Sequence, residues 1–165
     1  MKYLRVIVLI LCALTVFSGC AFGPQSQQQT ANFYYLCKEP VYGTEDGYIR
    51  AEPRESEGIL SEQEILSIYL AGPISEDLVS PFPEGSTILQ YGNNGSIIDV
   101  TVSPHFRELK GIQLVAAGGC LAKTAMALTG CDTVILSVKG GFENMSGPLT
   151  FHKNNMIFSD LENYP

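Results

Sequence analysis

The first segment with apolar residues at helical spacing follows Ser61. Ser61 and Glu64 form a capping box ahead of a run that is apolar at positions 65, 66 and 68–70. The hydroxyl at the N-cap and the carboxylate three residues later satisfy two otherwise unpaired amides. Gly72-Pro73 is expected to end this helix, because glycine permits a left-handed cap and proline cannot continue the turn.

The second helical pattern runs from Gly111 to Thr129, and Lys123 is its only charge between Ile112 and Thr129. A helix so poor in charge must be largely covered by the rest of the fold. Gly118-Gly119 would cost ~1 kcal/mol each relative to alanine. We therefore interpret this pair as allowing the helix to lie close on a sheet, with Gly130 as its cap.

Strand patterns fill the intervals between the helices. The clearest is a hairpin across Asn93-Asn94-Gly95, since Asn-Gly accepts the positive φ angles of tight hairpin turns. The expected strands are Phe33–Cys37, Tyr48–Glu52, Thr87–Tyr91, Ile97–Val102 and Thr133–Val138, with a possible C-terminal hairpin of Leu149–Phe151 and Met156–Phe158.

The resulting order, ββαββαβ, predicts an α+β fold in a single domain. Helices packed on one face of a mixed β-sheet satisfy this order best. We expect a domain over residues 32–140 and a C-terminal extension, 141–165, packed on it. The stretch from 20 to 31 is polar, uncharged and without period, which is typical of a flexible tether.

The N-terminus has the parts of a secretory signal. Lys2 and Arg5 precede the apolar run Val6–Phe17, which closes on Ser18-Gly19-Cys20. This arrangement resembles the lipobox of bacterial lipoproteins, although the lipobox usually has an aliphatic residue where Phe17 stands. The resemblance implies removal of residues 1–19 and a diacylglyceryl group on Cys20, which would tether the protein to the outer face of a cytoplasmic membrane or to the inside of an outer membrane. We favour the first location, in a Gram-positive envelope. Ordinary secretion and a retained membrane helix are the alternatives, and the apolar run is short for a span of ~20 residues.

Charge narrows the range of partners. The chain has 10 basic and 17 acidic residues, a net charge of −7. Lys2 and Arg5 would leave with the signal and no acid would, so eight basic and 17 acidic residues would give the mature chain a charge of −9. Nucleic acids and anionic lipid headgroups both require positive surface. We therefore expect neither as a partner.

We expect no disulfide to stabilise the mature domain. Cys12 would leave with the signal and Cys20 would carry the lipid, so three thiols would remain, which cannot all pair within one molecule. We place Cys120 and Cys131 at the ends of one helix, ~16 Å apart and beyond disulfide reach. Cys37 could pair with either, but we favour buried free thiols that act as small apolar side chains.

Catalytic constellations are not evident in the sequence. His105 and His152 lie in or near turns far apart, without metal-ligand spacing, so we predict no metal and no cofactor. Cys120 lies in an uncharged apolar helix, where a buried thiol is expected rather than a nucleophile. Asp99 lies mid-strand among apolar residues, as either a buried or partner-facing acid or a solvent-facing one. The remaining acidic residues that could act in a catalytic or binding site are interpreted as a solvated face: Glu52, Glu55, Glu57, Glu62 and Glu64.

The ordered set of motifs resembles the GerMN domain of sporulation and spore-germination proteins. The pieces that match are Tyr48–Glu52, the helix ending in Leu70-Ala71-Gly72-Pro73, the segment Pro83–Thr87, the strand Ile97–Ser103, and the apolar helix followed by Val134–Val138. The resemblance implies a fold similar to ring-building modules, assembly with envelope proteins or with itself, and no catalytic residues. The positions that it carries over are structural: Gly72 and Pro73 as the helix stop, and Pro83 and Gly85 as the turn before the hairpin.

Two functional hypotheses follow. The first is a lipid-anchored, non-enzymatic envelope protein that binds protein partners or itself. The second is an envelope lipoprotein that captures a peptide or a cell-wall glycan in the Pro81–Gly85 region beside Tyr91. A wall hydrolase is a distant third, because no constellation supports it.

Overall fold

The computed structural model describes residues 28–41, 47–143 and 146–155. Within these residues two α-helices and two 3₁₀ turns accompany the strands: α2 (Glu62–Leu70), α3 (Ile112–Thr129), η1 (Pro104–Glu108) and η2 (Lys153–Asn155). The strands are β1 (Gln28–Cys37), β2 (Ile49–Glu57), β3 (Leu78–Val79), β4 (Ile88–Asn93), β5 (Ile97–Val102), β6 (Thr133–Val138) and β7 (Leu149–His152). The α+β class predicted from the sequence is confirmed.

The strands form two sheets rather than the single mixed sheet that we predicted. The first has the order β2-β1-β3 and is antiparallel. The second has the order β4-β5-β6-β7, and only its β5–β6 pair is parallel. The sheets stay separate because β3 pairs with just the last two residues of β1, and helix side chains contact the same edge of β1 at Tyr34.

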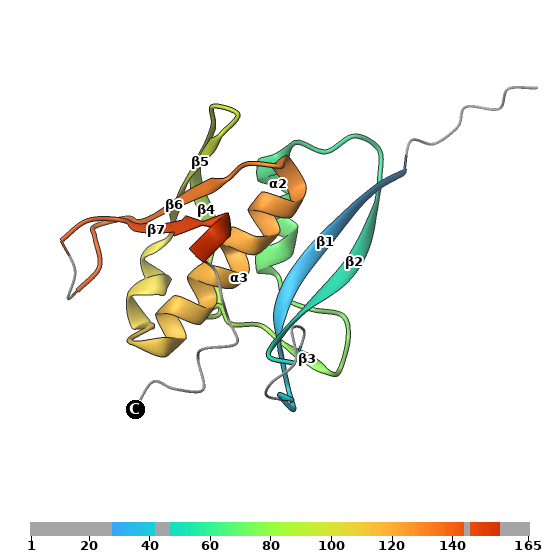
Figure 1. Ribbon diagram of the computed structural model, residues 1–165, viewed down its shortest axis with the longest axis horizontal. Helices are drawn as coiled ribbons and strands as arrows, with labels where there is room; N and C mark the ends of the chain where they lie inside the picture. Colours follow the sequence, from blue (N-terminus) through green and yellow to red (C-terminus); the bar gives the residue numbers. More distant parts are fainter. Residues whose placement is uncertain (1–27, 42–46, 144–145, 156–165) are drawn as a thin grey trace, which may run out of the picture.

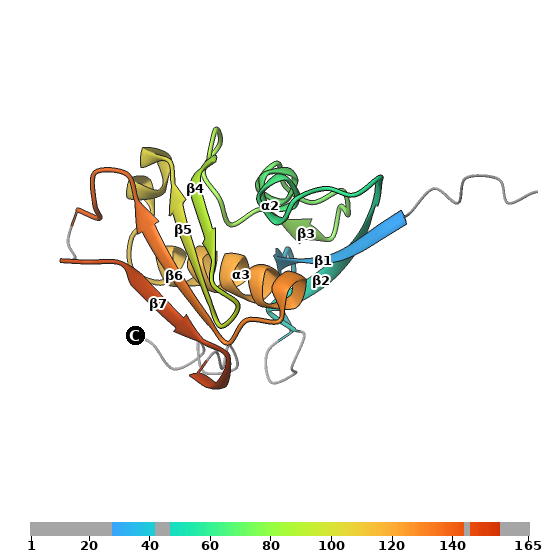
Figure 2. The same ribbon diagram turned by 90° about the horizontal axis from the view of Figure 1, so that it is seen from above.

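Helix α3 lies between the two sheets (Figure 2). It contacts β1 on one side and β6 and β7 on the other, whereas α2 contacts α3 and β4. By length and composition alone α3 could cross a membrane, but most of it is buried inside the domain. Its lack of charge therefore reflects a core position between two apolar surfaces.

The helix patterns are borne out residue by residue. Ser61 caps α2 and the capping box with Glu64 is present in both directions. The hairpin of β4 and β5 is confirmed, and Ile98, Val100 and Val102 all point into the core. Gly130 caps α3 in the left-handed conformation, with φ of 75°.

Aromatic side chains join α2 to the first sheet. Tyr69 of α2 packs on Phe33 and Tyr35 of β1, with ring centroids 5.2 and 4.9 Å away. Phe82 continues the cluster from Tyr69 to Phe106, at 5.1 and 5.7 Å. Phe106 lies in η1, a turn that the sequence analysis did not predict, and it is fully buried.

Several expected boundaries differ from the structure. Strand β1 begins at Gln28, so residues 28–31 belong to a sheet rather than to a tether. Strand β2 continues through Pro53 to Glu57, because antiparallel pairing with β1 extends to Gln28. Residues 1–27 lie outside the described part of the chain, as do residues 156–165 with the second arm of the expected C-terminal hairpin. The first arm is β7, which pairs with β6.

The cysteines also differ in part from expectation. Cys120 lies in the middle of α3, and Cys131 follows the helix because Gly130 ends it. Cys120 and Cys131 are buried free thiols, and Cys37, which is half-buried, forms a disulfide with neither of them. Burial raises the pKa of the Cys120 thiol, although Lys123 acts in the opposite direction. The thiol that we expected to be inert is therefore held in its neutral form.

Candidate functional site

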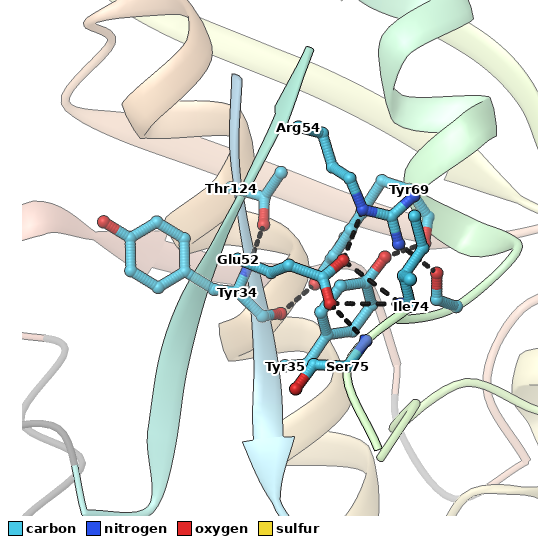
Figure 3. A network of polar contacts seen from close by, with 9 residues as sticks. Tyr34, Tyr35, Glu52, Arg54, Tyr69, Ile74, Ser75 and Thr124 are labelled. Atoms are coloured by element: carbon cyan, nitrogen blue, oxygen red, sulfur yellow. Dashed lines mark hydrogen bonds and ion pairs between the residues drawn. The ribbon is translucent and has the colours of Figure 1, made fainter. Parts of the chain in front are cut away.

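Glu52 is the centre of the most connected polar cluster in the described chain (Figure 3). Its side chain points from β2 toward the loop after α2, and the residue is 9% exposed. The amides of Ile74 and Ser75 donate to the carboxylate over 3.0 and 2.8 Å, and Arg54 donates through Nε. Because three protein donors bind this carboxylate and little of the residue is exposed, it joins β2 to the loop after α2.

Arg54 extends the cluster to the end of α2. Its Nη2 donates to the carbonyl oxygen of Gly72 over 3.1 Å, and its guanidinium lies 5.7 Å from the centre of the Phe33 ring. Gly72 has φ of 101°, a conformation that a residue with a side chain rarely adopts. Gly72 and Pro73 therefore end the helix as predicted, and the Glu52–Arg54 pair fixes the loop that they begin.

The ionisation of Glu52 follows from these contacts. Burial alone would raise the pKa of its carboxyl group, but the Ser75 amide, the Arg54 guanidinium and the Ile74 amide together hold that pKa below its usual range. The carboxylate stays charged at neutral pH, as its three donors require. Our interpretation of Glu52 as part of a solvated face was wrong, since a strand neighbour and a loop enclose it.

Side chains from both helices contact the edge of β1 at Tyr34 (Figure 3). Thr124 Oγ1 of α3 accepts a hydrogen bond from the Tyr34 amide over 3.0 Å. Tyr69 Oη of α2 donates a hydrogen bond to the Tyr34 carbonyl over 2.6 Å. Tyr35 Oη in turn donates to the Tyr69 carbonyl over 2.7 Å. Both backbone groups of Tyr34 are thereby satisfied without a neighbouring strand.

The turn before the hairpin is where the sequence predicted it. The Ser86 amide and hydroxyl both donate to the Pro83 carbonyl, over 3.2 and 2.7 Å. Gly85 has φ of 77°, and a Cβ there would lie 3.4 Å from His105 Nε2. A side chain at Gly85 would thus contact His105 and would be strained by the positive φ. Pro83 and Gly85 shape the turn that delivers the chain into β4.

His105 is an exposed residue bonded to a buried serine. Ser103 Oγ lies 3.1 Å from His105 Nδ1 and also accepts the amide of Thr87 over 3.1 Å. Ser103 is only 4% exposed, so its hydroxyl ties the start of the hairpin to η1. This pair resembles a nucleophile and base in composition alone, because burial of Ser103 leaves no access for a substrate.

An apolar groove of about 440 Å³ opens beside the Pro81–Pro83 segment. Its walls come from β1, from the segment after β3 and from the N-terminal half of α3. The main apolar side chains are Leu36, Tyr48, Pro81, Leu109 and Ile112. Tyr91, which we expected beside this region, instead donates to Glu62 Oε2 over 2.6 Å and holds β4 against α2.

The remaining sequence candidates do not converge on a site. Asp99 is exposed on β5, opposite Gly92 of β4, so it is not a buried acid. His152 is exposed and lies 3.1 Å from Thr133 Oγ1. Cys20 lies outside the described residues, and its lipidation stays a prediction.

No protein-family model matches the chain, and no curated protein matches it in sequence. Solved structures do match. The first GerMN domain of the sporulation protein GerM from Bacillus subtilis superposes with a TM-score of 0.55 at 13% identity, over 77% of this chain and 99% of that domain. The described domain has the GerMN fold.

A second solved structure, the tandem GerMN domains of the same Bacillus subtilis protein, matches with a TM-score of 0.56 at 17% identity. The match covers 74% of this chain and 46% of that one, so the chain spans about half of the tandem protein. At these identities the likeness shows the GerMN fold alone. The resemblance that we drew from the order of motifs is confirmed at that level.

Glu52 and Arg54 are the positions that sequence reasoning missed. They are two residues apart on a strand, and side chains at that spacing share a face. An acid and a base at this spacing beside Phe33 of the paired strand were a usable signal. What the sequence could not show was the loop at Ile74 and Ser75, whose amides come from more than twenty residues away.

Proposed function

We propose that this chain is a lipid-anchored, non-enzymatic protein of the cell envelope whose GerMN-like domain assembles with envelope proteins or with itself. The observation that carries the proposal is the GerMN fold, which a sporulation protein also has. Sporulation or spore germination is the process that this likeness favours. The acidic charge of the chain fits a protein surface as the partner better than a nucleic acid.

The lipid anchor rests on the segment Ser18-Gly19-Cys20 and on the charged, apolar stretch before it. Since β1 begins at Gln28, the segment between Cys20 and the sheet would reach at most about 28 Å when fully extended. The domain would then lie next to the membrane surface. Partners would be proteins of that surface rather than of the distant wall.

A non-enzymatic role is supported by how the polar groups are used. Backbone amides and Arg54 bind the Glu52 carboxylate, and the Ser103 hydroxyl binds the Thr87 amide. The Cys120 thiol is buried with a raised pKa. Each group that could act as acid, base or nucleophile in these clusters has a structural use.

The test is intact mass of the membrane-extracted protein, followed by crosslinking in its own envelope. We expect a mass that starts at Cys20 plus a lipid, and a discrete crosslinked partner or ladder. Cys20→Ser is the matched variant, because it should leave the domain folded and abolish the lipid. A mass without lipid would overturn the anchor, and a purified domain that hydrolyses a wall or ester substrate would overturn the non-enzymatic role.

The groove favours a second candidate function, capture of a peptide or of a cell-wall glycan. It is open and its apolar walls include Ile112, which is 44% exposed. Thermal shift with wall fragments and with short apolar peptides tests this candidate. Ile112→Glu should abolish a shift that Val115→Glu preserves, since Val115 is 43% exposed on the same helix but does not line the groove. Unchanged melting across the panel would remove the candidate.

A further inference from the structure

The N-terminal half of β1 projects from the body of the domain together with β2 (Figure 1). In an antiparallel pair, successive residues turn their backbone groups alternately toward the partner strand and away from it. Tyr34 presents its amide and carbonyl away from β2, to Thr124 and Tyr69. Gln28, Thr30 and Asn32 are spaced from Tyr34 by even numbers of residues. Their backbone amides and carbonyls therefore point to the same edge of β1, away from β2.

This edge is closed along only part of its length. Leu36 pairs there with Val79 of β3, and Tyr34 is satisfied by the helices. Within residues 28–41, 47–143 and 146–155, no strand or side chain bonds to the outward groups of Thr30 and Asn32, and both residues are exposed. A short row of strand donors and acceptors is left for another chain to pair with.

The opposite edge of the same ribbon is protected. Its outward positions are the partners of Thr30 and Asn32, namely Glu55 and Pro53 of β2. Proline has no amide to donate, and a charged residue on an edge disfavours strand addition. The contrast singles out β1 as the edge that accepts a strand.

Charge decides which strand fits. The segment from Gln28 to Cys37 contains no charged residue, so two copies of it can lie side by side without like charges opposite each other. The nearest acidic strands, β2 of each copy, would be three strand spacings apart, about 14 Å. That separation exceeds the screening length of about 8 Å at physiological salt.

We propose that two copies of this chain pair antiparallel through residues 28–32 of β1, with Thr30 facing Thr30 of the second copy. In this register the paired residues end before Tyr34, which bonds to side chains of α2 and α3, and they form about six backbone hydrogen bonds. So short a pairing is weak in solution and is strengthened where a membrane concentrates the copies. The inference rests on the proposed function and names the chain itself as its partner.

The test uses the full chain in the membranes of an expressing cell, with Cys37→Ser as the background. Thr30→Cys should yield a covalent dimer with a short bismaleimide, since facing residues of a hydrogen-bonded pair have Cα atoms about 5.5 Å apart. Glu55→Cys is the matched control, because residue 55 lies across the ribbon on the protected edge. Equal crosslinking of the two variants, or none of either, would overturn the pairing.

A charge variant gives an independent readout on the detergent-extracted protein. Thr30→Lys places two cations face to face and should move the monomer–dimer transition in sedimentation to a higher protein concentration, whereas Glu55→Lys should not. Unchanged melting temperatures of both variants exclude misfolding. A wild-type chain that sediments as a monomer at every concentration would overturn self-pairing. A different protein crosslinked in the envelope by wild type would leave the proposed function standing and remove only this inference.

Discussion

Single residues in this fold hold segments that are far apart in the sequence. Glu52 is the clearest case, since one carboxylate joins a strand to the loop at Ile74 and Ser75. Arg54 adds the Gly72 carbonyl to the same cluster. A buried carboxylate is stable only when such donors replace its water. Loss of the Glu52 charge should therefore destabilise the whole loop.

Glu52→Gln should lower the free energy of unfolding by about 1–3 kcal/mol at pH 7, because the buried donors lose a charged acceptor. The folded-state pKa of Glu52 is depressed, so its contribution is complete above the unfolded value of about 4.3 and is lost as the pH falls through the folded value. Urea unfolding from pH 7 to pH 3 should show the wild type and the variant converging. The exposed Glu84→Gln is the control and should change little. A constant difference at every pH would contradict this account.

Gly118 shows how close α3 lies to the second sheet. A Cβ at this position would stand 2.5 Å from Phe151 Cζ and 3.3 Å from Leu136 Cδ2. The interpretation that Gly118-Gly119 lets the helix approach a sheet is borne out for Gly118.

Gly118→Ala should destabilise the domain by about 1–2 kcal/mol, because overpacking against Phe151 outweighs the gain in helix propensity of about 1 kcal/mol. The Phe151→Ala background is the control, in which the same substitution should stabilise or be neutral. Thermal melting of the four proteins measures the coupling. Equal effects in both backgrounds would show that Phe151 is not what limits the residue at 118.

At the scale of elements, local signals predicted the helices well. The capping box of Ser61 and Glu64 and the Gly72-Pro73 stop are both observed, since they act through neighbours within four residues. Strand lengths were predicted less well. Strand β2 extends through Pro53 and several acids because its partner β1 continues, and that long-range pairing leaves no periodic signal in β2 itself.

Ser61→Ala should cost about 1 kcal/mol of stability, because the Glu64 amide loses its acceptor and the Glu64 carboxylate loses the Ser61 hydroxyl. Ser67→Ala is the matched control on the same helix, since the Ser67 hydroxyl donates to the Gln63 carbonyl inside the helix. Denaturant midpoints distinguish the two. If both substitutions lower the denaturant midpoint equally, the N-cap of α2 is not the source of the effect.

The division into two sheets is the feature that sequence order could not predict. An order of ββαββαβ fits one mixed sheet as well as two, and the choice depends on what meets the edge of β1. Thr124 and Tyr69 meet it, from helices 90 and 35 residues away. Neither residue differs in type from an ordinary core position, so no local pattern marks its role.

At the scale of the whole molecule, α3 contacts β1 of the first sheet and β6 and β7 of the second. Leu121, at its centre, is fully buried. Leu121→Ala should cost about 2–5 kcal/mol, and hydrogen exchange should then accelerate together in β1 and β6 because both lose the same support. Faster exchange in one sheet alone would show that the sheets unfold separately. The exposed Ala127→Ser on the same helix is the control.

The cluster around Tyr69 has a consequence for alkaline solutions. Burial raises the pKa values of Tyr35 and Tyr69, and the hydroxyl groups of both donate to backbone carbonyls, so neither can lose its proton while the cluster is intact. Groups with raised folded pKa values stabilise the domain fully below the unfolded value of about 10, and that stability is lost as the pH rises beyond it. A spectrophotometric titration should show exposed phenols ionising first and reversibly. The buried phenols should follow in one cooperative step that coincides with loss of circular dichroism. Ionisation of the aromatic cluster and alkaline unfolding of the domain would then be the same event.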